Sequence, residues 1–192
     1  RQRAMGMRDS NWEMKNMSGV ENGREHIRHE VWVCGGSNTI FNGVSAWLLM
    51  KGGGSLQWSG DHSFAGDVVA TAFLLPLIVA FIVIPLQRSK LNKGTLQPIN
   101  LGPSSLMQSL ADRFPASTAK SALLFGLIGI LIIAPVTRTG LYLFGVQTIN
   151  PEYDAVFKGL WAGLIAAILV VPMVLIALRE NASTHTVAVH GR

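Results

Sequence analysis

The stretch Val68–Leu86, VVATAFLLPLIVAFIVIPL, decides the fold because it contains no charged residue. Leu160–Leu178, LWAGLIAAILVVPMVLIAL, is a second stretch of the same kind. A helix needs about 20 apolar residues to cross the hydrocarbon core of a bilayer, and each stretch has close to that length. The two stretches therefore predict transmembrane helices, and we expect an integral membrane protein.

Two further uncharged stretches occur in the chain. Ser121–Thr137 is short, but Arg138 can extend its charged group to the lipid headgroups, and the apolar residues 141–146 lengthen the span. Val31–Met50 is long enough to span a bilayer but is the most polar of the four stretches. The sequence thus predicts an all-α, multi-pass protein with four transmembrane helices.

We expect the four helices to form one membrane domain, residues 31–178, with spans at about 31–50, 67–87, 120–146 and 157–178. A polar N-terminal extension, residues 1–30, precedes this domain, and a polar C-terminal tail, residues 179–192, follows it.

The positions of the basic residues predict the orientation. With the N-terminus inside, the inner segments carry all but three of the 16 Lys and Arg residues, and the outer loops carry only Lys51, Arg138 and Lys158. Cytoplasmic loops are enriched in Lys and Arg, so we expect both termini on the cytoplasmic side of a bacterial inner membrane or an organelle membrane. This interpretation assigns the net charge of +5 to orientation, and we expect no nucleic-acid partner.

The placement of aromatic residues agrees with this orientation. Trp and Tyr prefer the interface between lipid and water. Five of them fall near the predicted outer ends of the spans, namely Trp47, Trp58, Tyr142, Tyr153 and Trp161.

The composition excludes several classes of site. Hydrophobic residues make up 49% of the 192 residues and charged residues only 14%, which is too apolar for an ordinary soluble domain. Cys34 is the single cysteine, which excludes an intramolecular disulfide framework or a Cys-rich metal centre. The four uncharged stretches contain no Asp, Glu, Lys or His, which disfavours a proton-coupled carrier or a haem site. We predict no cofactor and no metal, expect bound lipid, and leave pigment binding open.

The segment between the second and third spans predicts a short helix over residues 103–114, with Ser104 as N-cap and Pro115 as the stop. Its apolar residues form one stripe, which consists of Leu106, Met107, Leu110 and Phe114. We expect this amphipathic helix to lie in the headgroup plane or beneath the bundle, with partner binding as the alternative.

Small residues predict close helix contacts. Gly159 and Gly163 form a GxxxG motif in the fourth span, and Gly126 and Gly129 give the third span a small-residue face. Small residues let helix backbones approach closely in a membrane. The contact is either within this bundle or with a partner protein.

Two features of the spans suggest a place for a solute. Pro76 and Pro172 lie in the middle of the second and fourth spans and predict kinks. Asn38, Asn42 and Ser45 share one face of the first span. These polar groups either join helices through hydrogen bonds or line a site for a polar solute.

Two groups of ionisable residues invite a catalytic or metal-binding interpretation. Residues 25–30, EHIRHE, hold two Glu and His pairs at i, i+4, but Arg28 lies between them, so we expect a solvated charged helix. Asp61 and His62 lie in a Gly-rich outer loop without a nucleophile, and we expect Asp67 to cap the second span. We predict no catalytic residue.

These observations favour a non-catalytic, accessory or structural subunit of a larger membrane complex, such as a respiratory or photosynthetic assembly. The chain has packing motifs and an interfacial helix, but it has no charged transport path in its spans. The alternative is a small-solute carrier or channel component that acts as an oligomer and uses Asn38, Asn42 and the two prolines.

Overall fold

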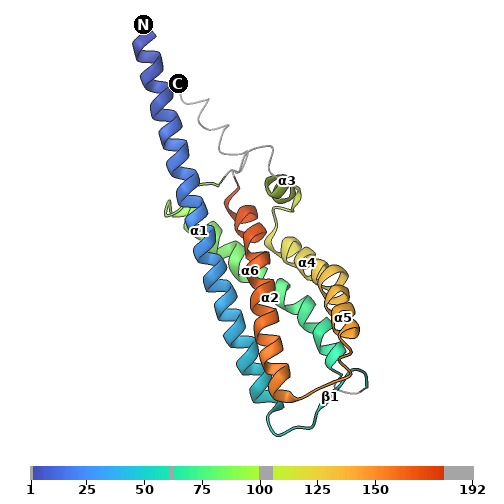
Figure 1. Ribbon diagram of the computed structural model, residues 1–192. Helices are drawn as coiled ribbons and strands as arrows, with labels where there is room; N and C mark the ends of the chain where they lie inside the picture. The colour runs from blue at the N-terminus through green and yellow to red at the C-terminus, as the bar shows by residue number, and fades with distance from the viewer. Residues whose placement is uncertain (1, 61–62, 100–105, 180–192) are drawn as a thin grey trace.

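The computed structural model describes residues 2–60, 63–99 and 106–179, with the side chains of residues 2–22, 107 and 108 left out. Four long helical rods make up nearly all of this part of the chain (Figure 1). They are α1 (Gln2–Met50), α2 (Phe64–Asn92), a third rod over residues 118–143, and α6 (Pro151–Leu178). The protein is therefore all-α, as the sequence predicts.

The rods alternate in direction, so that each runs opposite to the one before it (Figure 1). At one end of the bundle the chain turns back twice, from α1 into α2 and from the third rod into α6, and we call this end, with its two helical hairpins, the hairpin end. The two connections meet there, because β1 (Leu56–Gln57) of the first pairs antiparallel with β2 (Thr148–Ile149) of the second. The short helix α3 (Leu106–Arg113) lies at the opposite end, which we call the α3 end.

Three helices are long and apolar enough to cross a membrane among the residues that the structure describes: α2, the third rod and α6. Their outward surfaces carry large exposed apolar side chains such as Ile82, Leu131 and Leu160. These features are compatible with membrane insertion. The helix α1 is not among the three, and its predicted span stays a prediction.

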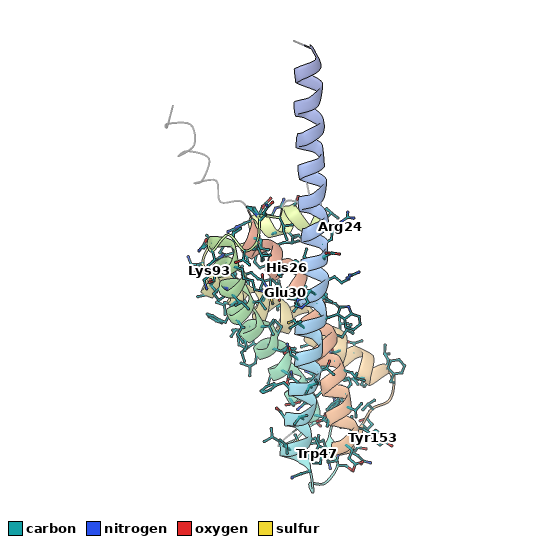
Figure 2. The ribbon with its side chains drawn as sticks, turned by 90° about the vertical axis from the view of Figure 1, so that its left-hand side faces the viewer. Arg24, His26, Glu30, Trp47, Lys93 and Tyr153 are labelled. Atoms are coloured by element: carbon teal, nitrogen blue, oxygen red, sulfur yellow. The ribbon has the colours of Figure 1, made fainter. Side chains whose placement is uncertain are left out.

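The predicted polar extension and the predicted first span form one helix. No break in α1 separates residue 30 from residue 31, and the helix also continues through Gly35 and Gly36. Residues 1–50 contain no proline, the residue that most strongly interrupts a helix. Figure 2 shows Trp47 at the hairpin end of α1, near Tyr153 of α6, and Arg24 close to the α3 end.

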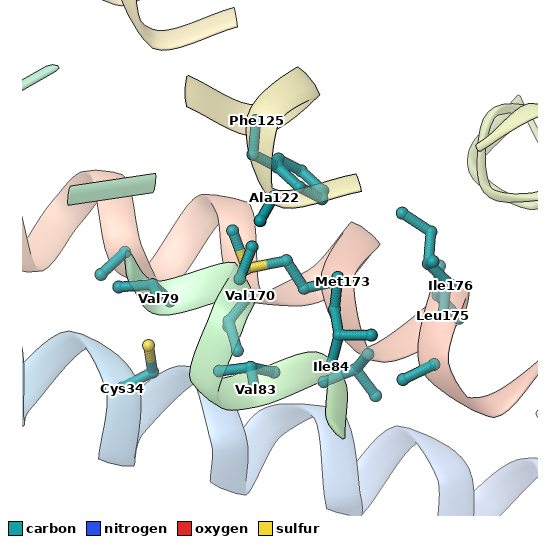
Figure 3. Close-up of a cluster of buried hydrophobic side chains, with 14 of the residues drawn as sticks. Cys34, Val79, Val83, Ile84, Ala122, Phe125, Val170, Met173, Leu175 and Ile176 are labelled. Carbon is teal, nitrogen blue, oxygen red and sulfur yellow. The ribbon is translucent and has the colours of Figure 1, made fainter. Parts of the chain in front are cut away.

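The core of the bundle lies around α6, which contacts α1, α2 and α3. Val170, Met173 and Leu175 of α6 are completely buried, and they pack with Ile84 of α2 and Phe125 of the third rod (Figure 3). Cys34 brings α1 into the same cluster. The bundle is thus centred on the helix that has the highest share of small and branched apolar residues.

The third rod is not a regular α-helix. It consists of α4 (Thr118–Ile128), a π-helical turn η1 (Gly129–Ile133) and α5 (Ala134–Leu143). Pro135 follows the π-helical turn and has no N–H to donate, so the regular hydrogen-bond pattern fails at this point. The sequence gives no sign of the turn other than this proline.

The π-helical turn contacts α2 at a second proline. Pro76 cannot donate to the carbonyl of Ala72, and this carbonyl points at Gly129, where an added methyl group would overlap its oxygen. Gly126 likewise lies against Phe73, whose ring would be 2.8 Å from an added Cβ atom. The two predicted small residues of the third span therefore lie in its contact with α2.

Candidate functional site

The GxxxG motif of α6 lies against α1. An added Cβ at Gly159 would be 2.8 Å from the carbonyl oxygen of Thr39, and one at Gly163 would overlap the hydroxyl of the same residue. On α1, Gly43 faces Gly159, and Gly35 faces Gly163. We call this contact the glycine seam. The predicted packing residues thus lie in a contact between two helices of this chain.

Polar residues recur every fourth position along the inward side of α1. We call this row the α1 polar stripe, and it consists of His26, Glu30, Cys34, Asn38 and Asn42. The Nδ2 of Asn38 donates to the carbonyl of Cys34, and that of Asn42 donates to the carbonyl of Asn38, both at 2.9 Å. Each amide is half-buried and keeps its oxygen for another partner. The Nδ2 of Asn38 also lies 3.7 Å from Cys34 Sγ, whereas that of Asn42 keeps its second N–H for another partner. Ser45 is also half-buried.

The α3 end of the stripe joins α1 to α2 through ionisable side chains. His26 Nε2 lies 2.9 Å from Gln87 Oε1, and Lys90 Nζ donates to Glu30 Oε1 at 2.9 Å. Burial would raise the pKa of Glu30, but the hydrogen bond from Lys90, the nearby side chain of Gln87 and the charges of Lys90 and His26 outweigh this effect. The pKa of Glu30 is therefore below its ordinary value.

This geometry corrects the expectation of a fully solvated charged helix over residues 25–30. Glu25 and His29 are exposed, but His26 and Glu30 face α2 and are largely buried (Figure 2). The i, i+4 spacing put both residues on one face, but the sequence did not reveal that α2 covers it. Within the described residues, no group of three or more His, Cys, Asp or Glu side chains lies close enough to hold a metal ion.

Three charged residues meet at the hairpin end. Lys158 Nζ of α6 lies 2.5 Å from Asp67 Oδ2 of α2 and 3.8 Å from Asp154 Oδ2 of its own helix. Asp154 is completely buried, and neither of its carboxylate oxygens has a hydrogen-bond partner. We call this group the hairpin-end cluster.

Sequence reasoning missed the hairpin-end cluster because all three residues lie just outside the uncharged stretches. The i, i+4 spacing of Asp154 and Lys158 was the available signal, since such pairs face each other on a helix. The expected cap role of Asp67 is also wrong. Ser63 is the N-cap of α2, and its Oγ accepts the N–H of Gly66, because the helix begins at Phe64 and not at the edge of the apolar stretch.

The short helix α3 begins at Leu106 and ends at Arg113, so Phe114 lies just beyond it, contrary to the predicted range. Leu106 and Leu110 are exposed, whereas the ring of Phe114 stacks on Phe125 with 5.0 Å between centroids. The predicted apolar stripe is thus divided between solvent and the bundle. Ser104 and the side chain of Met107 lie outside the described residues.

Arg179 fixes α3 to the end of α6. Its Nη1 donates to the carbonyls of Ala111 and Phe114 at 3.1 and 2.8 Å. The carbonyl of Ala111 also accepts the N–H of Phe114 at 3.2 Å, and the carbonyl of Phe114 lies just beyond the last turn, where a helix end leaves carbonyls without helical partners. Arg179 therefore supplies donors to carbonyls at the C-terminal end of α3.

The remaining predicted site residues lie within α2 and α6 or outside the described part of the chain. The helix α2 continues through Pro76 and α6 continues through Pro172. Asp61 and His62 lie outside the described residues. An open apolar groove of about 630 Å³ runs along the outer side of the glycine seam, lined by Gly43, Trp47 and Ala155 among others.

Comparison with known proteins adds no relative to this picture. No protein-family model matches the chain, no curated protein matches it, and no solved structure matches it.

Proposed function

We propose that the protein is a non-catalytic membrane subunit of a larger complex, such as a respiratory or photosynthetic assembly. In this proposal it spans the membrane four times, with both termini on the cytoplasmic side. The observation that carries the proposal is the N-terminal part of α1, which projects beyond the bundle (Figures 1 and 2).

The projecting part of α1 precedes Gly23, the first residue of this helix whose surroundings the structure describes. Gly23 still packs on Ile99, with 3.3 Å between an added Cβ and the side chain. About 20 residues precede it, which corresponds to roughly 30 Å of helix. A single helix of this length is marginal in water unless another surface covers one of its faces. A partner protein would supply that surface.

The hydrogen bonds of α1 support its proposed place in the membrane. A span must satisfy its polar groups without water. Thr39 Oγ1 donates to the carbonyl of Gly35, and Ser37, Asn38 and Asn42 donate to carbonyls of α1 in the same way. On the opposite side Ile40 and Phe41 are exposed, as a lipid-facing surface requires. The polar residues of this stretch are thus compatible with a fourth span.

A truncation tests the proposal. We would extract the native membrane with a mild detergent, separate complexes by native electrophoresis and identify co-migrating proteins by mass spectrometry. The full chain should co-migrate with a large complex at fixed stoichiometry, and a variant without residues 2–22 should migrate alone with its bundle intact. Migration of the full chain alone, or as a small homo-oligomer, would contradict the proposal.

A second function, a small-solute carrier or channel component, is supported by the half-buried amides of the α1 polar stripe. Asn38→Leu and Asn42→Leu would remove the free amide groups that a polar solute would contact. Solute flux should then fail while assembly persists. If the double variant instead loses assembly and shows no selective flux defect, these amides have a packing role.

The apolar groove along the glycine seam supports the expected bound lipid. Gly43, Ala155 and Gly159 form its floor because they lack bulky side chains. An acyl chain would fill the groove and recover dispersion contacts that an empty gap loses. Native mass spectrometry of the purified chain should therefore show a retained lipid, and Gly43→Leu should release it.

A further inference from the structure

The hairpin-end cluster contains more negative than positive charge. Two carboxylates, Asp67 and Asp154, face the single ammonium of Lys158. Lys158 is nearest to Asp67, and the side chain of Asp67 remains about one-third exposed. Asp154 has no exposed surface at all. The excess negative charge thus falls on the carboxylate that water does not reach.

The surroundings of Asp154 compensate this charge only in part, through Lys158 at 3.8 Å and through its place in the first turn of α6. Neither of its oxygens accepts a hydrogen bond, although an ionised carboxylate in a buried place ordinarily needs several donors. The charged groups that face it within the described residues are Asp67 from α2 and Lys158 from α6. Phe64 and Val68, which flank Asp67 on α2, and Ala155, which follows Asp154 on α6, are buried and apolar.

Other charges at the hairpin end have different partners or positions. Lys51 lies over the ring of Trp47, and Arg138 lies over the ring of Trp58. Glu152 of α6 is exposed. The residues Asp61 and His62 of the connecting loop lie outside the described part of the chain.

We propose that the hairpin-end cluster is a proton-binding site, in which Asp154 holds one exchangeable proton beside the ion pair of Asp67 and Lys158. The proton is taken from water and returned to it, and it reduces the net charge of the cluster from minus one to zero. A metal ion suits the cluster poorly, because the Lys158 ammonium occupies the space between the carboxylates. This property goes beyond the proposed role as a subunit.

The site links protonation to the contact between α2 and α6. Release of the proton leaves an unpaired charge between these two helices at the hairpin end, and Lys158 then has to divide its charge between two carboxylates. The hairpin end is therefore expected to loosen when the proton leaves, while the α3 end, which holds none of these residues, keeps its packing.

Infrared spectroscopy of the full chain in lipid tests the proposal through the C=O band of a protonated carboxylic acid. The wild type should show this band at neutral pH, with a shift in deuterated water, and Asp154→Asn should lose it. Glu152→Gln is the matched control, because it removes an exposed carboxylate from the same turn of α6, and it should leave the band unchanged.

Two further variants keep the test decisive even if Asp154→Asn does not fold. Asp67→Asn frees Lys158 to pair with Asp154, so the band should disappear at a lower pH than in the wild type. Lys158→Met removes the neighbouring positive charge, so the band should persist to a higher pH. The proposal is overturned if the wild type lacks the band at every pH at which it is folded, or if these two shifts have the same sign.

Discussion

Gly129 shows how one residue sets the distance between two helices. The carbonyl of Ala72, which Pro76 deprives of its usual donor, points directly at this glycine. A side chain here would push the third rod away from α2 at the π-helical turn. The absence of a side chain at residue 129 is therefore a requirement of the fold at this contact.

Gly129→Ala should destabilise the bundle. The added methyl overlaps the carbonyl oxygen of Ala72, and such overpacking costs about 1–3 kcal/mol. Denaturant unfolding followed by circular dichroism measures the loss. Gly140→Ala is the control, because an added Cβ at Gly140 meets nothing within 4 Å, and its stability should stay unchanged or rise slightly. Equal stability of the two variants would contradict the contact.

Glu30 should make the α3 end sensitive to acid. The pKa of Glu30 in the folded protein is below its ordinary value, so ionised Glu30 stabilises the folded protein. This stabilisation is fully present above the pKa that Glu30 has in the unfolded chain, and it is lost as the pH falls through the lower pKa of the folded protein. Unfolding measured from neutral to acidic pH should show this loss in the wild type, and Lys90→Met should reduce it.

The matched control for this titration is Glu25→Gln on the exposed side of α1, which should behave as the wild type does. A Lys90→Met variant that loses stability with acid as steeply as the wild type would show that the pair with Glu30 does not produce the effect.

The role of a single residue could be predicted where it depends only on near neighbours in the sequence. The spacing of Gly159 and Gly163 indicates a small-residue face whatever the fold, and the structure locates that face in the glycine seam. The buried state of Asp154 was not predictable, because it depends on α2 and Lys158 closing over it. Charged side chains are mostly exposed, so the sequence favours an exposed Asp154 and does not reveal its burial.

At the scale of elements, an uncharged stretch is sufficient to predict a helix such as α2 or α6. The number of consecutive apolar residues sets the length of the predicted span. The observed helices α2 and α6 contain the spans predicted at residues 67–87 and 157–178. The helix α1 continues from residue 30 to residue 31, because a change of polarity does not interrupt a helix. Pro135 was the one sign of the π-helical turn in the sequence, and a proline does not specify which irregularity a helix adopts.

Arg179→Ala should release α3 from the bundle. The variant loses two hydrogen bonds from a charged donor, each worth about 1.5–3 kcal/mol, so local opening should increase at least about tenfold. Cleavage by chymotrypsin at Leu106 and Leu110 measures this opening. Arg113→Ala, which changes an exposed arginine of α3 itself, should leave the cleavage rate near that of the wild type. Equal rates for both variants would show that Arg179 does not hold α3.

At the scale of the whole molecule, the proposed orientation places the hairpin end outside and the α3 end inside. Cys34 is the single cysteine, so Cys34→Ala provides a background without thiols. In that background, Gly53→Cys at the hairpin end should react with a membrane-impermeant thiol reagent in right-side-out vesicles. Lys93→Cys at the α3 end should react only after permeabilisation.

Both positions are exposed, so each thiol should react fully in detergent. Reaction of the two variants from the same side of sealed vesicles would contradict the single crossing by α2 that the proposal places between them. The reverse pattern would retain the helices but invert the orientation that the basic residues predict.

Because α1 is one continuous helix, a change in its tilt within the bundle also moves its N-terminal end. The glycine seam and the contacts of His26 and Glu30 hold the helix as far as Gly23, and an unbroken helix connects this point to the other end some 21 residues away, which corresponds to roughly 30 Å. A tilt of about 5° at this point would then displace the far tip by about 3 Å. A partner bound at that tip would therefore be coupled to the angle at which α1 leaves the bundle.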